Sequence, residues 1–220
     1  MGRASRTAPG QIILTIRTQP PVIDFAMKYK TILMFGAPGS GKGTQGKILG
    51  TVPNFFHCDC GDVFRSLRPD SELGKTFISY SSRGRLVPDA PTVELWRRFI
   101  DASTQTGRFH PAADTLVLDG IPRNVTQAEM LADALNVAAV FYLTCANPEN
   151  LVTRLQRRAI KENRLDDANL DIIRDRLKIY EQETKPVLKF YGSKVVHRIN
   201  ADGTPAGIFL DILKRVVKLR

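Results

Sequence analysis

The sequence predicts an α/β fold in which one parallel sheet is flanked by helices. Two observations indicate this: from residue 31 onward short apolar runs alternate with longer amphipathic ones, and a glycine-rich loop directly follows the first apolar run. Such alternation is typical of βαβ units, because parallel neighbouring strands need a crossover connection that is usually a helix. With 220 residues the chain is long enough for one such body and too short for two ordinary independent domains.

Five apolar runs are expected to form the strands, and each is followed by helical sequence. The strands are predicted at residues 31–35, 54–58, 115–118, 138–144 and 194–199. The helices are predicted at residues 41–49, 90–106, 125–135, 148–161, 168–191 and 205–217. Ligands of open α/β sheets collect at the carboxyl ends of the strands, so we expect the functional site there.

The formal charge of +10 raises the question of a nucleic-acid partner. Most of this charge lies near the two ends of the chain, within residues 1–30 and 214–220, and the central body is close to neutral. No basic stripe interleaved with aromatic residues lies between them, so we expect no nucleic-acid interface. No apolar run approaches the ~18 residues that cross a bilayer, so we expect no membrane partner.

The cysteines indicate a reducing compartment. Cys58, Cys60 and Cys145 are an odd number that cannot be fully paired within the chain. A two-cysteine C-x-C segment lacks the four ligands of a structural zinc site. We therefore expect a cytoplasmic protein without structural zinc.

Residues 1–26 differ in composition from the rest of the chain. They mix Arg, Ser, Thr, Pro and Gly with a short apolar stretch at residues 11–16, and they contain no acid before Asp24. This composition resembles a targeting peptide, and the alternative is that translation starts at Met27, just before the first strand. We expect a disordered extension at residues 1–26 and a single domain at residues 27–220.

The loop after the first strand has the features of a phosphate-binding loop. Residues 36–44 read G-A-P-G-S-G-K-G-T, which matches G-x-x-x-x-G-K between a strand and a helix. Glycines let backbone N–H groups surround phosphate oxygens, the helix presents its positive N-terminus, and Lys42 reaches the β and γ phosphates. Gly43 stands where the general motif has Ser or Thr, so we expect Mg²⁺ to be held largely through water.

The same loop resembles that of the adenylate kinase family, and further segments extend the likeness over roughly residues 30–215. They are C-G-D-V-F-R at 60–65, S-E-L-G-K at 71–75, G-R-L-V-P-D at 84–89, D-G-I-P-R at 119–123 with Gln127 four places on, and R-L-D-D at 164–167. The resemblance implies an enzyme that transfers the γ-phosphate of ATP to AMP with Mg²⁺, on a P-loop NTPase-type parallel sheet flanked by helices. It also implies mobile segments: an AMP-binding segment at about residues 60–88 and a short lid at about residues 158–167.

Matching positions assign the binding residues implied by the resemblance. The ATP-binding set is Gly36, Gly39, Ser40, Gly41, Lys42, Gly43, Thr44, Arg154 and Arg158. The AMP-binding set is Cys60, Gly61, Arg65, Leu86, Val87, Gly120, Arg123, Gln127, Arg164 and Arg176. So many fixed cations suit this reaction, because two polyanionic nucleotides repel one another.

The catalytic set implied by the resemblance is Lys42, Arg123, Arg158, Arg164, Arg176 and Asp119. Asp119 ends an apolar strand at the carboxyl edge, where its carboxylate would hold the water shell of Mg²⁺. The gap between Arg164 and Arg176 is one residue longer than in the family pattern, so Arg174 is an alternative. Tyr180, one helical turn after Arg176, favours Arg176.

Cys60 stands where the family usually has threonine. A thiol near the start of a helix has a lowered pKa, so Cys60 is a candidate reactive thiol in the open cleft. The alternative is a small buried packing residue. We interpret His57, His110 and His197 as structural, because none has an acid or base partner in the sequence.

Two rival functions remain at this stage. Asn124 after Pro122-Arg123 resembles the UMP/CMP kinase subfamily, whereas Gln127 favours AMP, since an amide can bind adenine through two hydrogen bonds. A non-catalytic nucleotide-binding protein on the same scaffold is the other rival, although none of the expected cations is missing. We expect a monomer whose partners are the small molecules ATP and AMP.

Overall fold

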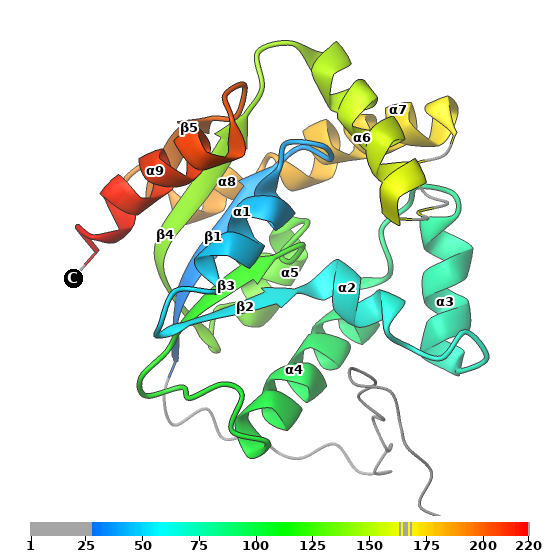
Figure 1. Ribbon diagram of the computed structural model, residues 1–220. Coiled ribbons are helices and arrows are strands. Elements are labelled where there is room, and N and C mark those ends of the chain that lie inside the picture. The colour runs from blue at the N-terminus through cyan, green and yellow to red at the C-terminus, as the bar shows by residue number, and fades with distance from the viewer. Residues whose placement is uncertain (1–27, 163, 165–166, 168, 220) are drawn as a thin grey trace, which may run out of the picture.

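The chain folds around a five-stranded parallel sheet with the strand order β2-β3-β1-β4-β5 (Figure 1). The computed structural model describes residues 28–162, 164, 167 and 169–219. The strands are β1 (Tyr29–Gly36), β2 (Phe55–Asp59), β3 (Thr115–Asp119), β4 (Leu135–Thr144) and β5 (Val196–Asn200). All five expected strands are present, which confirms the predicted fold class.

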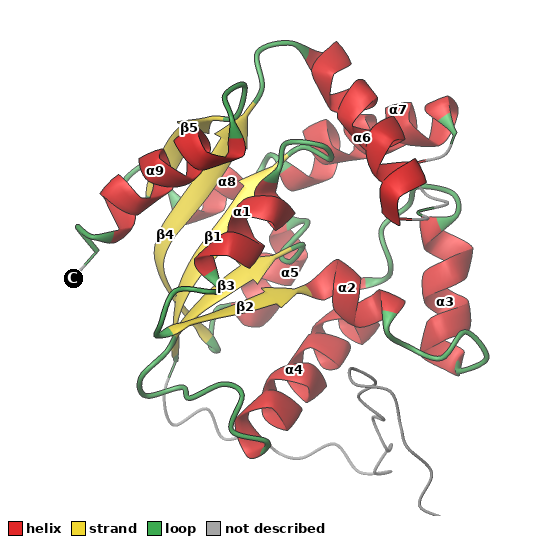
Figure 2. Cartoon of the chain, in the orientation of Figure 1, coloured by secondary structure: helices red, strands yellow, loops and turns green. Residues whose placement is uncertain are grey.

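Helices cover both faces of the sheet and extend beyond its carboxyl edge (Figure 2). They are α1 (Lys42–Leu49), α2 (Cys60–Arg65), α3 (Glu72–Ser81), α4 (Asp89–Gln105), α5 (Val125–Leu131), α6 (Pro148–Glu162), α7 (Leu170–Ile179), the π-helical turn η2 (Tyr180–Thr184), α8 (Val187–Tyr191) and α9 (Pro205–Val216). None of the helices within the described ranges is long and apolar enough to cross a membrane.

The side chains of β1 alternate between two hydrophobic cores. Ile32 belongs to the core that α1 and α9 cover, where Ile212 is fully buried. Leu33, the next residue, belongs to the opposite core, which includes Trp96 of α4 and Leu131 of α5. Because β1 is buried on both faces, it is an almost continuous apolar run, as expected for a central parallel strand.

Helices α2 and α3 were not predicted from the sequence. The Asp59 side chain caps α2 by accepting a hydrogen bond from Asp62 N at 3.1 Å, and Ser71 caps α3 by accepting one from Gly74 N at 3.1 Å. Such caps satisfy backbone N–H groups that have no partner within the helix. Since α2 has six residues, it is too short for helical periodicity to stand out in the sequence.

Two predicted helices have different bounds in the structure. The prediction at residues 168–191 was wrong as one helix, since α7 ends at Ile179, η2 follows, and α8 begins after Pro186. Proline has no N–H and its ring clashes with the preceding turn, so the helix is interrupted there. The prediction at residues 125–135 was too long, because α5 ends at Leu131 and Leu135 already pairs with Tyr29 in the sheet.

Some expectations fall on parts of the chain that the structure does not cover. The expected extension at residues 1–26 lies outside the described residues. Residues 163 and 165–166 of the expected lid also lie outside them.

Three neighbouring strands bring the candidate site residues to one edge of the sheet. β1 leads into the glycine-rich loop, β2 ends at Asp59, and β3 ends at Asp119. Asp59 and Asp119 are direct partners in the parallel register. Because parallel strands end at the same edge, residues far apart in the sequence meet there.

We expect Phe141→Ala to lower the free energy of unfolding by about 3–5 kcal/mol, because it removes a large side chain from the centre of β4 and leaves a cavity. Phe141 is 0% exposed. The matched control is Phe190→Ala in α8, where the ring is 42% exposed, and a loss below about 1 kcal/mol is expected. Equal losses in urea unfolding of the two variants would contradict this assignment of the core.

Candidate active site

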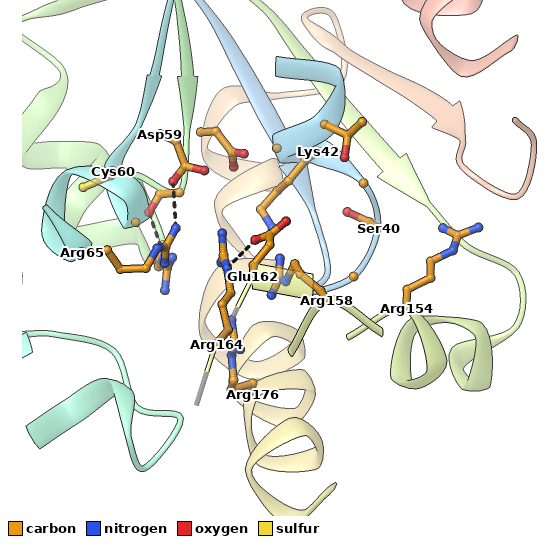
Figure 3. Close-up of a pocket in the computed structure, with 18 of the residues that line it drawn as sticks. Ser40, Lys42, Asp59, Cys60, Arg65, Arg154, Arg158, Glu162, Arg164 and Arg176 are labelled. Carbon is orange, nitrogen blue, oxygen red and sulfur yellow. Dashed lines mark hydrogen bonds and ion pairs between the residues drawn. The ribbon is translucent and has the colours of Figure 1, made fainter. Parts of the chain in front are cut away.

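A cavity of about 510 Å³ opens at the carboxyl edge of the sheet (Figure 3). Its lining includes three acids, Asp59, Asp119 and Glu162. It also includes eleven basic residues: Lys42, Lys47, Arg65, Arg85, Arg123, Arg154, Arg157, Arg158, Lys161, Arg164 and Arg176. This excess of positive charge suits ligands that carry several phosphate groups.

The structure gathers the residues that the sequence assigned to nucleotide binding. Apart from Gly36, every residue of the two expected binding sets lines this cavity, and so does Asp119. Gly36 lines a smaller cavity of about 70 Å³, which Lys42 and Arg123 also border. Residues from six separate segments of the sequence therefore form one site.

The phosphate loop is shaped by positions that exclude side chains. A Cβ atom added to Gly36 would lie 2.5 Å from Ser40 Oγ and 2.7 Å from Leu143 O. Gly39 and Gly41 have φ values of 83° and 92°, in the left-handed region that favours glycine. Gly41 precedes α1 and provides no side-chain cap, so the first backbone N–H groups of α1 are left for a ligand.

Lys42 enters the cavity from the first turn of α1. Burial lowers the pKa of its ammonium group, and Arg123 and Arg158 lower it further, whereas Asp119 and Asp59 raise it. A phosphate group would reverse this shift by placing negative charge beside the ammonium. The lysine is thus arranged to gain from binding a polyphosphate.

Arg65 and Arg123 approach one corner of the cavity from α2 and from the β3–α5 loop. A Cβ atom on Gly61 would lie 3.1 Å from Arg65 Nη1, and one on Gly120 would lie 3.5 Å from Arg123 Nη2. Arg123 Nε donates to Gly120 O at 2.8 Å. The added Cβ of Gly120 would also lie 3.6 Å from Gly61 N, so the two glycines are neighbours. Two guanidinium groups at one corner suit a single phosphate.

Asp62 pairs with two cations, Arg65 and Lys47. Arg65 Nη2 donates to Asp62 Oδ1, and Lys47 Nζ lies 2.9 Å from Asp62 Oδ2. Burial raises the pKa of Asp62, but the hydrogen bonds from Arg65 and Lys47 outweigh it and bring the pKa to about 2. The carboxylate therefore stays charged and holds Arg65 at the cavity wall.

Gln127 lines the cavity and is held by a hydrogen-bond network. Its Oε1 accepts from Arg123 N at 2.8 Å, and its Nε2 donates to Asp89 Oδ1 at 2.7 Å. These bonds fix which way the amide points and leave one N–H and one lone pair for a ligand. Asn124 caps α5 and also donates to Asp89 Oδ1 at 2.8 Å, but it does not line the cavity. Asn124 is therefore explained by local structure.

Asp167 joins two of the arginines expected to contact ATP and the transferring group. Its carboxylate is 0% exposed, lies 2.7 Å from Arg158 Nε and also pairs with Arg176 Nη1. Arg174, the alternative to Arg176, has a 72% exposed side chain, pairs with Asp171 and does not line the cavity. The geometry thus supports Arg176 as the closing arginine.

Arg164 pairs with carboxylates of two different helices, α6 and α2. Its Nε lies 2.7 Å from Glu162 Oε2, and its Nη2 lies 3.6 Å from Asp62 Oδ1. Its side chain is 12% exposed. Its guanidinium group therefore lies at the cavity, between Glu162 and Asp62 (Figure 3).

Helix α6 contributes more cations than the sequence analysis assigned. Arg154, whose Nη2 donates to Ala201 O at 3.0 Å, and Arg158 were expected. Arg157 and Lys161 also line the cavity. The spacing of these four residues is the signal that was missed, since positions i, i+3, i+4 and i+7 share one face of a helix.

Asp119 has the properties expected of a residue that faces a metal cation. It is 2% exposed, and its Oδ1 has no hydrogen-bond partner among the described residues. Burial raises its pKa to about 6, although Lys42 and Arg123 oppose this shift. Within the described ranges no cluster of three His, Cys, Asp or Glu side chains is arranged to hold a metal. A cation here would therefore need water or phosphate oxygens as further ligands, which fits Mg²⁺.

The interpretation of Cys60 as a reactive thiol was wrong. Cys60 is the first residue of α2, is 2% exposed and belongs to the hydrophobic core. Burial raises the pKa of its thiol to about 12, and the nearby Arg123 only partly opposes this. The position at the start of α2 does not compensate for the loss of water around the sulfur. Cys60 is a packing residue that lines the cavity wall.

The sheet, the phosphate loop and the facing arginines define a P-loop protein that transfers phosphoryl groups between nucleotides. The family model for adenylate kinase matches residues 34–196. An adenylate kinase of Flavobacterium psychrophilum is 35% identical over 180 residues, which cover 79% of this chain and 90% of the relative. That of Bacteroides fragilis is 36% identical over 84% of this chain and 97% of the relative. That of a Cyanothece species is 39% identical over 73% of this chain and 80% of the relative.

The chain therefore belongs to the adenylate kinase family. This confirms the resemblance inferred from its motifs and the prediction of an ATP-dependent phosphotransferase.

We expect Asp167→Asn to destabilise the protein by about 3 kcal/mol, because it removes the buried carboxylate charge that pairs with Arg158 and Arg176. Turnover should fall as well, since both arginines lose their orientation. The matched control is Asp171→Asn at the start of α7, whose side chain is 86% exposed and pairs with exposed Arg174. Urea unfolding and ADP formation of the two variants measure the difference, and similar behaviour would contradict the role of Asp167.

Proposed function

We propose that the chain transfers the γ-phosphate of ATP to AMP and gives two molecules of ADP. The observation that carries this proposal is one cavity with a phosphate loop at one end, paired arginines with an amide at the other, and more arginines between them. Two nucleotides bind with their phosphates facing each other, and the fixed cations offset the repulsion between them.

ATP binds on the phosphate-loop side. The backbone of residues 36–44 surrounds its phosphates, and Lys42 and Arg158 neutralise them. Arg154 stacks on the adenine. Arg157 and Lys161 add positive charge along the same face of α6.

AMP binds beneath α2 and α3. Arg65 and Arg123 hold its phosphate, and the free edge of the Gln127 amide accepts the base. Leu86 and Val87 supply an apolar wall, since both line the cavity. Adenine offers a donor and an adjacent acceptor to an amide, so this end suits AMP.

Catalysis needs alignment and charge stabilisation and no protein nucleophile. An oxygen of the AMP phosphate attacks the γ-phosphorus, and the bond to the β-γ bridging oxygen breaks, so that ADP leaves. Lys42, Arg123, Arg158, Arg164 and Arg176 surround the transferring group and stabilise charge in the transition state. The short lid and the segment at residues 60–88 close over the substrates and exclude water.

Mg²⁺ fits the site beside Asp119. The buried Asp119 Oδ1, which has no hydrogen-bond partner among the described residues, supports this part of the proposal. Bound there with ATP, the cation would neutralise phosphate charge and orient the phosphates. Gly43 has no hydroxyl that could bind the cation directly. Water would therefore complete its coordination, and Asp119 would hold it through this water.

The setting of the enzyme is also part of the proposal. We infer a cytoplasmic monomer that forms one domain from residue 27 to residue 220. Its three cysteines are free thiols, which supports a reducing compartment.

We expect Lys42→Met and Arg123→Ala each to lower turnover by about 10³- to 10⁵-fold, the scale found when a cation that stabilises phosphoryl transfer is removed. A coupled assay of ADP formation measures this. Lys30→Met is the control, because Lys30 is an exposed residue of β1 outside the cavity. Near-normal turnover of either folded site variant would reject the mechanism.

We expect AMP to be at least about tenfold better as acceptor than CMP, UMP or GMP, and Gln127→Ala to weaken AMP use far more than ATP binding. A site built to hydrogen-bond a base discriminates by leaving polar groups unpaired with the wrong one. The matched control is Gln105→Ala at the end of α4, an exposed glutamine outside the cavity, which should not change acceptor choice. Better use of CMP or UMP by the wild type would replace this assignment with the rival one.

A further inference from the structure

A single carboxylate oxygen holds two amide side chains in place beside the cavity. Asp89 Oδ1 accepts a hydrogen bond from Gln127 Nε2 at 2.7 Å and another from Asn124 Nδ2 at 2.8 Å. Asp89 is the first residue of α4, whereas the two amides belong to α5 and its N-cap. Asp89 itself is not among the described residues that line the cavity. It can therefore act on a ligand only through another residue.

Gln127 lines the cavity with an amide whose direction is fixed from both sides. The residue is 1% exposed. Its Nε2 faces the Asp89 carboxylate, which accepts, and its Oε1 faces the backbone N–H of Arg123 at 2.8 Å, which donates. Turning the amide over would place N–H against N–H and oxygen against oxygen. Because unpaired buried polar groups are costly, the amide keeps one direction.

Nucleobases fall into two classes by the order of the groups on their hydrogen-bonding edge. Adenine and cytosine have an amino donor beside a ring nitrogen that accepts, whereas guanine and uracil have a carbonyl acceptor beside a ring N–H that donates. An amide that is free to turn over pairs with either order, and an amide of fixed direction pairs with one. Under the proposed function, Arg65 and Arg123 hold the acceptor's phosphate, so the base meets the Gln127 amide in one orientation.

We propose that Asp89 is a positioning residue that restricts the acceptor site to bases with an amino donor beside a ring acceptor, so that CMP is a secondary acceptor and GMP and UMP are rejected. This inference rests on the proposed function, in which Gln127 meets the adenine of AMP, and it names the class of acceptor and the residue that sets it. CMP remains weaker than AMP, because cytosine has one ring and buries less apolar area against Leu86 and Val87.

The kcat/KM values of the wild type with four acceptors give the first test. We expect AMP to be best and CMP second, with UMP and GMP at least about tenfold below CMP, since the wrong edge leaves polar groups of the site unpaired. UMP is the sharpest comparison, because its base has the same ring size as that of CMP and the opposite edge. Equal use of CMP and UMP would overturn the proposal.

Asp89→Leu removes the accepting oxygen and gives the second test. We expect the KM for AMP to rise at least about tenfold and the preference for CMP over UMP to fall at least about fivefold, as a lost buried hydrogen bond implies. Turnover at saturating AMP and the KM for ATP should stay within about twofold, because the phosphates are held by other residues. An unchanged preference in a folded Asp89→Leu protein would refute the role of Asp89.

Asp89→Asn is the conservative variant, because it removes the charge and keeps an oxygen that accepts from both amides. Its preference for CMP over UMP should stay within about threefold of the wild type, since the amide direction needs an acceptor and not a negative charge at the start of α4. A loss as large as that in Asp89→Leu would contradict the proposal.

Glu94→Leu is the matched control on the same helix. Glu94 pairs with Arg98 at 2.7 Å, is not among the described residues that line the cavity, and loses the same charge. Its preference for CMP over UMP should be unchanged. A merely structural role of Asp89 would lower turnover with all acceptors and leave this preference as it is, so an equal change in both leucine variants would overturn the proposal.

ADP formation and nucleotide binding together separate this inference from the proposed function. A wild type that makes ADP from AMP but uses CMP and UMP equally refutes the inference and leaves the function standing. A wild type that transfers no phosphate, yet binds CMP more tightly than UMP in titration calorimetry, with the difference lost in Asp89→Leu, refutes the function and leaves the role of Asp89 standing.

Discussion

The site depends on holding many positive charges together around one cavity before any phosphate is present. Eleven lysines and arginines line it, and they repel one another where water is partly excluded. Three carboxylates reduce this repulsion: Asp167 pairs with Arg158 and Arg176, Asp62 with Arg65, and Glu162 with Arg164. Arginine has five donors, so each guanidinium that holds a carboxylate still has N–H groups for a phosphate.

The charged side chains of the cavity lie on two kinds of structural element, the ends of strands and the helices beyond the sheet. Lys42, Asp59, Asp119 and Arg123 lie on or next to the ends of buried strands and are rigidly placed. Most of the other cations lie on α2, α6 and α7, beyond the sheet. Gly84, in the loop after α3, lies close to α7, because a Cβ atom added there would lie 2.9 Å from Arg176 Cγ. The loop between α3 and α4 therefore packs directly against α7.

Asp89 links the Gln127 side chain to the scaffold. It accepts hydrogen bonds from both Asn124 and Gln127, and so sets the direction of the amide that faces the cavity. The feature that suggested a UMP/CMP kinase thus belongs to the network that orients Gln127. The sequence could not show this, because only the structure shows that Asn124 bonds to Asp89 and does not line the cavity.

The sequence by itself determined the five parallel strands, the phosphate loop and the family. Apolar periodicity and the G-x-x-x-x-G-K spacing are local, so they can be detected without knowing which segments meet. Short capped helices such as α2 and the interruption before Pro186 were missed or misplaced, because they depend on single side chains and on packing.

Only the tertiary structure decided the properties that depend on neighbours far away in the chain. Burial makes Cys60 a packing residue with a raised pKa, although its place at a helix start had favoured the opposite. The pairing of β2 with β3 puts Asp59 opposite Asp119, sixty residues later in the chain, and the turn into α1 brings Gly43 against both. The pKa of a group and the ligands it can share depend on surrounding charge and solvent, and these are set when distant segments pack together.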